Sequence, residues 1–210
     1  MTDTPEIITT GFGWFEQTGD EAELTATFAA VAPTRSDAVA LLGEQLKALE
    51  VPLVTAVLRS RRMWVRSEYE ETYGQQPRVV GCRAGQDWVL HLTDTAALED
   101  VLATLIAAEP TDLNGPRWLL RDPASAQREA QHRAVASARN RAEGYAEALG
   151  GTLGPLRSLA EEHWEQGLVT PLAFAAKDSS GGGPVIRDLG LEPEPVRVSA
   201  RCTTTWTLLT

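Results

Sequence analysis

Three histidines and two cysteines are the residues of this chain best suited to metal binding or covalent chemistry. His91 is expected in a strand, His132 on the polar side of a helix and His163 at a strand end. None has a second His or Cys at a ligand spacing such as HExxH or CxxC, so we expect no metal site and no cofactor. His91 could act as a base opposite a carboxylate, but the pattern favours an exposed strand histidine.

The cysteines fit no catalytic or metal-binding spacing. Cys82 and Cys202 stand far apart and fall on the apolar side of their predicted strands. A buried thiol behaves as a small hydrophobe, whereas the reactive species is the thiolate. We therefore expect two buried thiols and no disulfide, with redox sensing as a weaker alternative.

Nucleotide-binding and hydrolase fingerprints are missing from the sequence. There is no GxSxG, Walker A or GxGxxG pattern, and the glycine run at 181–183 lacks the Lys and Ser/Thr of a phosphate loop. We therefore predict no catalytic residue and a protein that is not an enzyme.

The most suggestive local feature is the segment RSRRMWVR. Its members are Arg59, Arg61, Arg62, Trp64 and Arg66. Arginine beside tryptophan suits an anion site or a subunit interface, where both residue types are enriched. A plain edge strand, protected from aggregation by its charges, is an equally good interpretation.

Composition narrows the class of partner. The chain has 210 residues, of which 43% are hydrophobic and 23% charged, and a net charge of -10, so it is an ordinary globular protein without nucleic-acid binding. No apolar run is long enough to cross a bilayer, which predicts no membrane insertion. The opening residues lack the pattern of a secretory signal, so we expect a cytoplasmic protein.

Hydrophobic periodicity predicts an α+β fold with a mainly antiparallel sheet and helices packed on one face. Strands are expected over 6–15, 22–30, 54–66, 79–92, 113–120, 153–162 and 196–208, and helices over 34–49, 94–109 and 122–151. From residue 22 the order is the βαββαβ of a ferredoxin-like unit, followed by a long alanine-rich helix and two further strands. We expect one domain over 1–210, with a flexible Gly/Pro-rich excursion at about 166–194.

The long helix is the element around which we expect the chain to be organised. Asp122 can cap it, Pro123 suits its first position and Gly150-Gly151 can end it. Its apolar side is expected to comprise Ala130, Ala134, Val135, Ala138, Ala142, Tyr145, Ala146 and Leu149. A stripe made mostly of alanine has little bulk, so it favours close packing against a sheet.

Several segments in order resemble the bacterial SIMPL-domain family. They are TTGFG, GDEAELTATF, PTRSDAVALL, the helix AVASARNRAEGYAEALGG with the strand that follows it, and the terminal VRVSARCTTTWTLL. The resemblance implies an α+β fold and, as in some members, ring-like or cage-like homo-oligomers with links to oxidative-stress defence. The family has no established catalytic motif to carry over.

Two classes of function follow. The leading hypothesis is a non-enzymatic protein that acts through homo-oligomeric assembly or partner binding, with a stress-related role. The alternative is a small-molecule module or enzyme whose pocket lies between the sheet and the 166–194 excursion. That pocket would bring together polar groups such as His91, Arg83 and Arg201.

Overall fold

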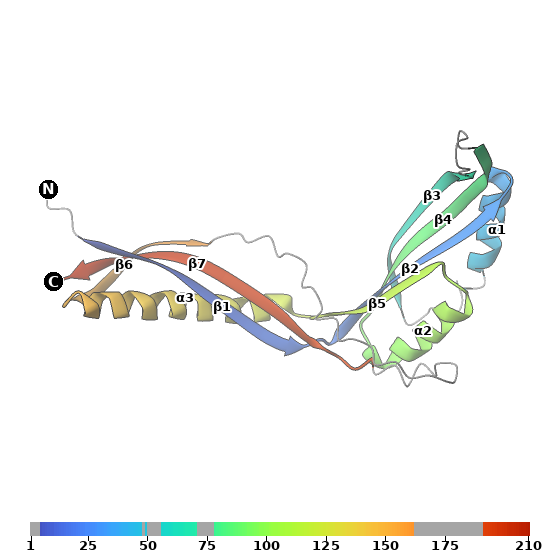
Figure 1. Cartoon of the computed structure of the whole chain (residues 1–210). Helices are drawn as coiled ribbons and strands as arrows, with labels where there is room; N and C mark the ends of the chain where they lie inside the picture. Colours follow the sequence, from blue (N-terminus) through green and yellow to red (C-terminus); the bar gives the residue numbers. More distant parts are fainter. Residues whose placement is uncertain (1–4, 48, 50–55, 71–77, 162–190) are drawn as a thin grey trace, which may run out of the picture. The chain divides into compact units, whose positions relative to one another are not determined.

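The computed structural model of the chain describes residues 5–47, 49, 56–70, 78–161 and 191–210 (Figure 1). These residues form two compact units, each with its own sheet. The alanine-helix unit contains 5–18, 122–161 and 195–210, and the ferredoxin-like unit contains the described part of 19–121 and 191–194. A single domain over 1–210 stays a prediction, and most of the expected 166–194 excursion lies outside the described residues.

The ferredoxin-like unit follows the predicted order of elements. It comprises β2 (Glu21–Ala32), α1 (Arg35–Lys47), β3 (Val57–Glu70), β4 (Arg78–Leu92), α2 (Leu98–Ala107) and β5 (Asp112–Leu119). The sheet order is β3-β4-β2-β5 with every neighbouring pair antiparallel. This is the arrangement of a split βαβ unit, so the ferredoxin-like prediction is confirmed.

The helices lie over one face of this sheet (Figure 1), and that face carries the core of the unit. Phe28 of β2 and Trp88 of β4 are buried there and meet edge to face, with ring centres 5.2 Å apart. The helices contribute Ala38, Leu42, Leu46, Leu98, Val101, Leu102 and Leu105 to the core. Ile106, at the end of its helix, and Val80, near the start of its strand, are apolar but exposed.

Side-chain caps begin both helical segments of this unit. The Thr34 hydroxyl accepts from the backbone N–H of Asp37 at 3.2 Å and donates to the Asp37 carboxylate at 2.7 Å. Asp94 accepts from the N–H of Ala96 at 3.0 Å, at the start of the 3-10 turn that leads into α2. These side chains satisfy backbone donors that have no partner inside the helix.

The alanine-helix unit has a sheet of its own. Its strands are β1 (Glu6–Thr18), β6 (Thr152–Glu161) and β7 (Pro195–Leu209), paired antiparallel in the order β1-β7-β6. The C-terminal tail therefore joins a sheet, as predicted, and does so as the central strand. The prediction of one sheet is wrong, because β1, β6 and β7 pair with one another and not with β2–β5.

Helix α3 (Pro123–Ala148) begins and ends as predicted, and it lies along this sheet (Figure 1). Asp122 accepts from the N–H of Ser125 at 3.0 Å, and Gly150 takes a φ of 75° just beyond the helix. The buried residues are six alanines spaced by four: Ala126, Ala130, Ala134, Ala138, Ala142 and Ala146. The predicted apolar side was too wide, because this single row makes the contact and leaves Val135, Tyr145 and Leu149 exposed.

The helix approaches β1 so closely that only glycine fits beneath it. A Cβ atom added to Gly11 would collide with the carbonyl oxygen of Ala134, and one added to Gly13 with that of Ala130. Both glycines face α3, because they alternate along β1 with side chains on the opposite face. The contact is therefore backbone against backbone.

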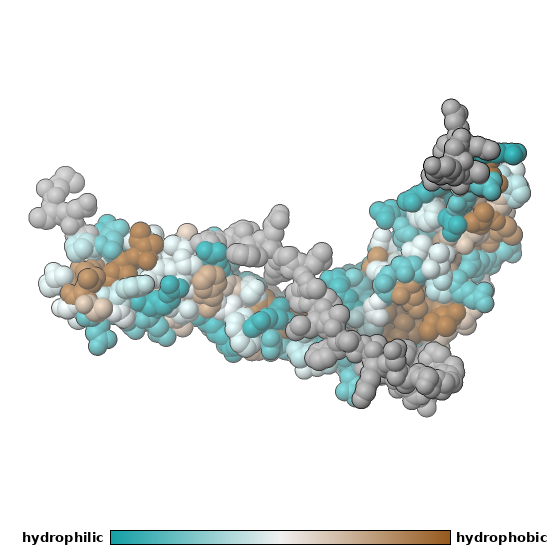
Figure 2. Space-filling model, in the orientation of Figure 1, coloured by the Kyte–Doolittle hydropathy of each residue, from teal (hydrophilic) through white to brown (hydrophobic). Residues whose placement is uncertain are grey.

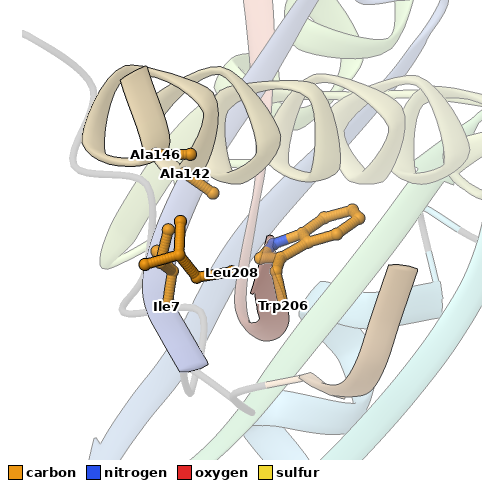
Figure 3. Close-up of a cluster of buried hydrophobic side chains, with 5 residues drawn as sticks. All are labelled: Ile7, Ala142, Ala146, Trp206 and Leu208. Carbon is orange, nitrogen blue, oxygen red and sulfur yellow. The ribbon is translucent and has the colours of Figure 1, made fainter. Parts of the chain in front are cut away.

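Larger apolar side chains fill the space between sheet and helix at one end of this contact. At one end Ile7, Trp206 and Leu208 pack against Ala142 and Ala146 (Figure 3).

Further along the contact, buried hydroxyls are satisfied internally. The Thr9 hydroxyl donates to the carbonyl of Ala138 at 2.8 Å, and the Trp206 indole N–H donates to the Thr204 hydroxyl, also at 2.8 Å. Burial of these polar groups is tolerated because each has a partner.

Replacing Gly11 with alanine should lower the free energy of unfolding by about 1–3 kcal/mol, because helix and strand must move apart to admit one methyl group. Urea unfolding of the purified chain measures the change. Gly144→Ala is the matched control: it lies in α3 with open space around it and should stabilise the protein by up to about 1 kcal/mol. Equal midpoints for Gly11→Ala and the parent would show that the close approach does not exist.

Candidate functional site

The RSRRMWVR segment lies on β3, which is an edge strand of the ferredoxin-like sheet. Trp64 is paired with Gly85 of β4, and its ring occupies the space that a Cβ at Gly85 would need. Its indole N–H donates to Asp87 Oδ1 at 3.1 Å, and the guanidinium of Arg66 lies 4.7 Å from its ring centre. The tryptophan is therefore fixed against its own sheet, on the face that the helices do not cover.

Asp87 of β4 accepts hydrogen bonds from side chains on both neighbouring strands, β2 and β3. Besides Trp64, the Thr27 hydroxyl donates to it at 3.1 Å and the Arg62 guanidinium at 3.1 and 3.3 Å. The pKa of this carboxyl is lowered, first by the hydrogen bond from Trp64 and to a smaller extent by Arg62 and Thr27, while partial burial acts in the opposite direction. Asp87 is thus held as a carboxylate that ties β2, β3 and β4 together.

His91 is buried, with only 5% of its surface exposed, so the prediction of an exposed strand histidine is wrong. Its Nε2 lies 2.9 Å from Glu21 Oε2, and its Nδ1 lies 3.0 Å from a nitrogen of Arg59. A guanidinium can only donate, so Nδ1 accepts and Nε2 carries the proton that is shared with Glu21. Both ring nitrogens are engaged, and neither is available as a base.

A bulge in β3 explains why His91 is covered. The β3–β4 register shifts between Leu58 and Ser60, so Arg59 is the extra residue and reaches His91. On the other side, Arg121 binds Glu21 at 3.2 Å and donates to the carbonyl of Thr93 at 2.7 Å. Strand parity alone does not predict this covering, because it depends on residues from three separate segments.

Two further ion pairs lie on this open face. Arg117 binds Glu23 at 2.6 Å, and Arg83 pairs with Glu68. Of the five predicted interface residues, Arg61 alone lies opposite Trp88, on the helix-covered side, with its guanidinium 4.8 Å from that ring. The structure therefore places Arg59, Arg62, Trp64 and Arg66 together on the open face; that they form an interface stays a prediction.

The open face of the alanine-helix unit is different in character. Ile8, Phe12 and Trp14 of β1 point away from α3 and are 66%, 55% and 46% exposed. The guanidinium of Arg201 lies 5.0 Å from the Phe12 ring centre, and that of Arg197 lies 4.1 Å from the Trp14 ring centre. Figure 2 shows hydrophobic surface on this unit among hydrophilic residues.

This apolar face was not among the sites predicted from the sequence. A signal was present, because Phe12 and Trp14 alternate with Gly11 and Gly13. If the glycines face a helix, a period of two puts both rings on the other side of the strand. That inference required knowing that α3 covers the glycines.

A cavity of about 110 Å³ lies beside α3, between it and strands β6 and β7. Its lining residues are Gln131, Ala134, Val135, Leu159, Glu161, Ala200, Arg201 and Cys202. Gln131 donates to Glu161 at 3.1 Å on its lining. The space is mainly apolar and includes one buried thiol.

Two of the three polar groups predicted to converge on a pocket, His91 and Arg83, do not meet. His91 and Arg83 lie eight residues apart along β4, which corresponds to roughly 27 Å in an extended strand, and Arg201 belongs to the other unit. Both cysteines are buried thiols, as predicted. Within the described residues, no three His, Cys, Asp or Glu side chains are grouped to hold a metal ion. No helix in the described ranges is long and apolar enough to cross a membrane.

Asp87→Asn should lower the free energy of unfolding at pH 7 by about 1–3 kcal/mol, because three donors lose a charged acceptor. The pKa of Asp87 is lowered in the folded chain, so its contribution is complete above the unfolded pKa and is lost as pH falls through the folded pKa. The effect of the substitution should therefore shrink below about pH 4.

Chemical denaturation from pH 3 to pH 7 measures this dependence. Glu44→Gln is the control, since Glu44 pairs with Lys47 on the exposed surface of α1 and should matter little at any pH. An Asp87→Asn deficit of the same size at pH 3 and pH 7 would contradict a role for the charge.

Comparison with known protein families gives a match over most of the chain. No curated protein matches the chain. The model of the SIMPL family, described as "Protein of unknown function (DUF541)", matches residues 7–206. That span includes both units, from the first strand to the tryptophan near the end of the last. The chain belongs to the SIMPL family.

Proposed function

We propose that this SIMPL protein acts through association with protein partners, with self-assembly first among them, and not through catalysis. The observation that carries the proposal is the face of the β1-β7-β6 sheet opposite α3, where, among the described residues, Ile8, Phe12 and Trp14 are exposed in one row. Exposed apolar side chains gathered on one face are typical of interaction surfaces. A stress-related role is the part of the proposal that rests on the family resemblance alone.

The contrast between the two open faces supports this choice of surface. In the ferredoxin-like unit, the open face carries hydrogen-bonded charges such as Asp87 with Arg62 and Glu21 with Arg121, and its exposed Val31 and Val57 lie opposite the polar Arg83 and His91. Removing those groups from water would cost desolvation energy with little new pairing to offset it. On the other sheet, burial of Phe12 and Trp14 removes apolar surface from water, which favours association.

Ligand binding in the cavity beside Cys202 is a second candidate function. The cavity is a concave, largely apolar space, which is the usual character of a small-molecule site. Its volume of about 110 Å³ is small, however, against the several hundred Å³ that drug-sized ligands occupy. Association therefore remains the function that the geometry supports best.

The double substitution Phe12→Ser with Trp14→Ser should shift the protein from an oligomer towards a monomer, because it removes the two aromatic rings from the face. Size-exclusion chromatography with light scattering measures the mass over a range of concentrations. A fall in apparent association constant on the order of a hundredfold is expected for the loss of two interface aromatics.

Val31→Ser is the matched control, because Val31 is 50% exposed on a strand of the other sheet. It should leave the mass unchanged. A strict monomer for the unaltered chain at every concentration would overturn self-assembly, and equal effects of the two changes would overturn this choice of face.

A further inference from the structure

We infer that the outer edge of β3 binds an extended peptide segment of a partner protein, in which acidic side chains alternate with apolar ones. Strand β3 ends the order β3-β4-β2-β5, and among the described residues no strand pairs with its outer edge (Figure 1). This edge belongs to the ferredoxin-like unit, so the inference goes beyond the proposed association through the β1-β7-β6 sheet.

The backbone of β3 supplies the first part of the site. Between its two register shifts, residues 60–68 pair with β4 without interruption. Alternate peptide groups of this stretch point towards β4, and the others point outward. A row of outward N–H and C=O groups is the template of β-augmentation, in which a peptide adds as one more strand. The main chain then provides affinity, and the side chains beside the edge select the sequence.

The side chains beside this edge on the open face are basic. Arg62, on one side of Trp64, has a side chain that is 79% exposed. Arg66, on the other side, stands directly opposite Arg83 of β4, and like charges at such positions destabilise a sheet. Arg83 is paired with Glu68. Arg66 contacts the Trp64 ring and has no carboxylate partner among the described residues, so an incoming carboxylate would offset the repulsion.

This part of the surface is basic although the chain is acidic. The open face of β3 and β4 carries four arginines and two carboxylates, an excess of two positive charges, in a chain of net charge -10. The arginines are Arg59, Arg62, Arg66 and Arg83, and the carboxylates are Glu68 and Asp87. An acidic strand is complementary to this local charge.

The side chains of β3 on the other face favour apolar neighbours. Met63 and Val65 alternate with the basic residues and point to the helix side, where Met63 is 48% exposed. A partner strand presents its own side chains to the two faces with the same period of two. Its acidic residues would therefore lie beside Arg62 and Arg66, and its apolar residues beside Met63.

Other occupants fit this edge less well. Two β3 strands paired across a two-fold axis near their centre would bring arginines beside arginines, which opposes pairing with a second copy. A nucleic acid needs free cations for its phosphates, whereas Arg62 is already bound to Asp87. Pairing at the edge leaves the open face in water, so this ion pair need not be broken.

A peptide titration tests the inference on the full chain. The probe is a capped, fluorescein-labelled peptide of alternating glutamate and valine, and its binding is followed by fluorescence anisotropy at low salt. One control peptide carries lysine in place of glutamate, and the other is the glutamate peptide with its backbone amides N-methylated. Only the unmethylated glutamate peptide should bind saturably, because main-chain hydrogen bonds and opposite charge are both required.

A charge reversal locates the site on the chain. Arg66→Glu should weaken binding on the order of tenfold, because a carboxylate then faces the incoming acidic strand. Since Arg66 lies opposite Arg83, the reversal should not destabilise the sheet, and thermal unfolding checks this. Arg128→Glu is the matched control, because Arg128 is exposed on α3 of the other unit and the net charge changes equally.

The outcomes separate this inference from the proposed function. Binding that is lost on N-methylation and weakened by Arg66→Glu, but not by Arg128→Glu, would support the inference. No binding, or equal binding of either control peptide, would overturn it. A single-stranded oligonucleotide that binds more tightly than the glutamate peptide and is lost in Arg66→Glu would overturn a peptide as the occupant. Phe12→Ser with Trp14→Ser should leave peptide binding unchanged, so the two proposals can fail separately.

Discussion

The contact between the alanine row of α3 and the glycines of β1 is the constraint on which the alanine-helix unit depends. Gly11 and Gly13 lie so close to the backbone carbonyls of α3 that no larger residue fits. Many weak dispersion contacts over a long, flat surface stabilise such packing, in place of a few bulky side chains. The interface is only one row of side chains wide. Tyr145 and Leu149 lie outside that row and therefore remain exposed to solvent.

The same contact determines what the opposite face of the sheet can be. With glycine at alternate positions of β1, the large side chains of that strand have only the other face to occupy. Phe12 and Trp14 are consequently exposed beside Arg201 and Arg197, which lie over their rings. The proposed association surface is thus a direct result of how the helix packs behind it.

The sheet faces opposite the helices carry different side chains in the two units. In the ferredoxin-like unit, charged side chains from neighbouring strands neutralise one another, and Trp64 is fixed over Gly85 by its bond to Asp87. Its edge strand β3 is rich in arginine, a common protection against unwanted strand pairing. The other face exposes Ile8, Phe12 and Trp14, and these side chains support the choice of that face for association.

Local patterns in the sequence determined the helices and strands of this protein, because these patterns depend only on neighbouring residues. They include the alternation of the strands, the caps at Thr34 and Asp94, and the start of α3 at Asp122. Only the tertiary structure decided that the strands divide into two sheets, that a bulge brings Arg59 over His91, and that Phe12 and Trp14 form an open face. Those outcomes depend on which distant segments meet. Strand pairing and helix packing are non-local, and the same alternating pattern can serve in either sheet and with either face outward.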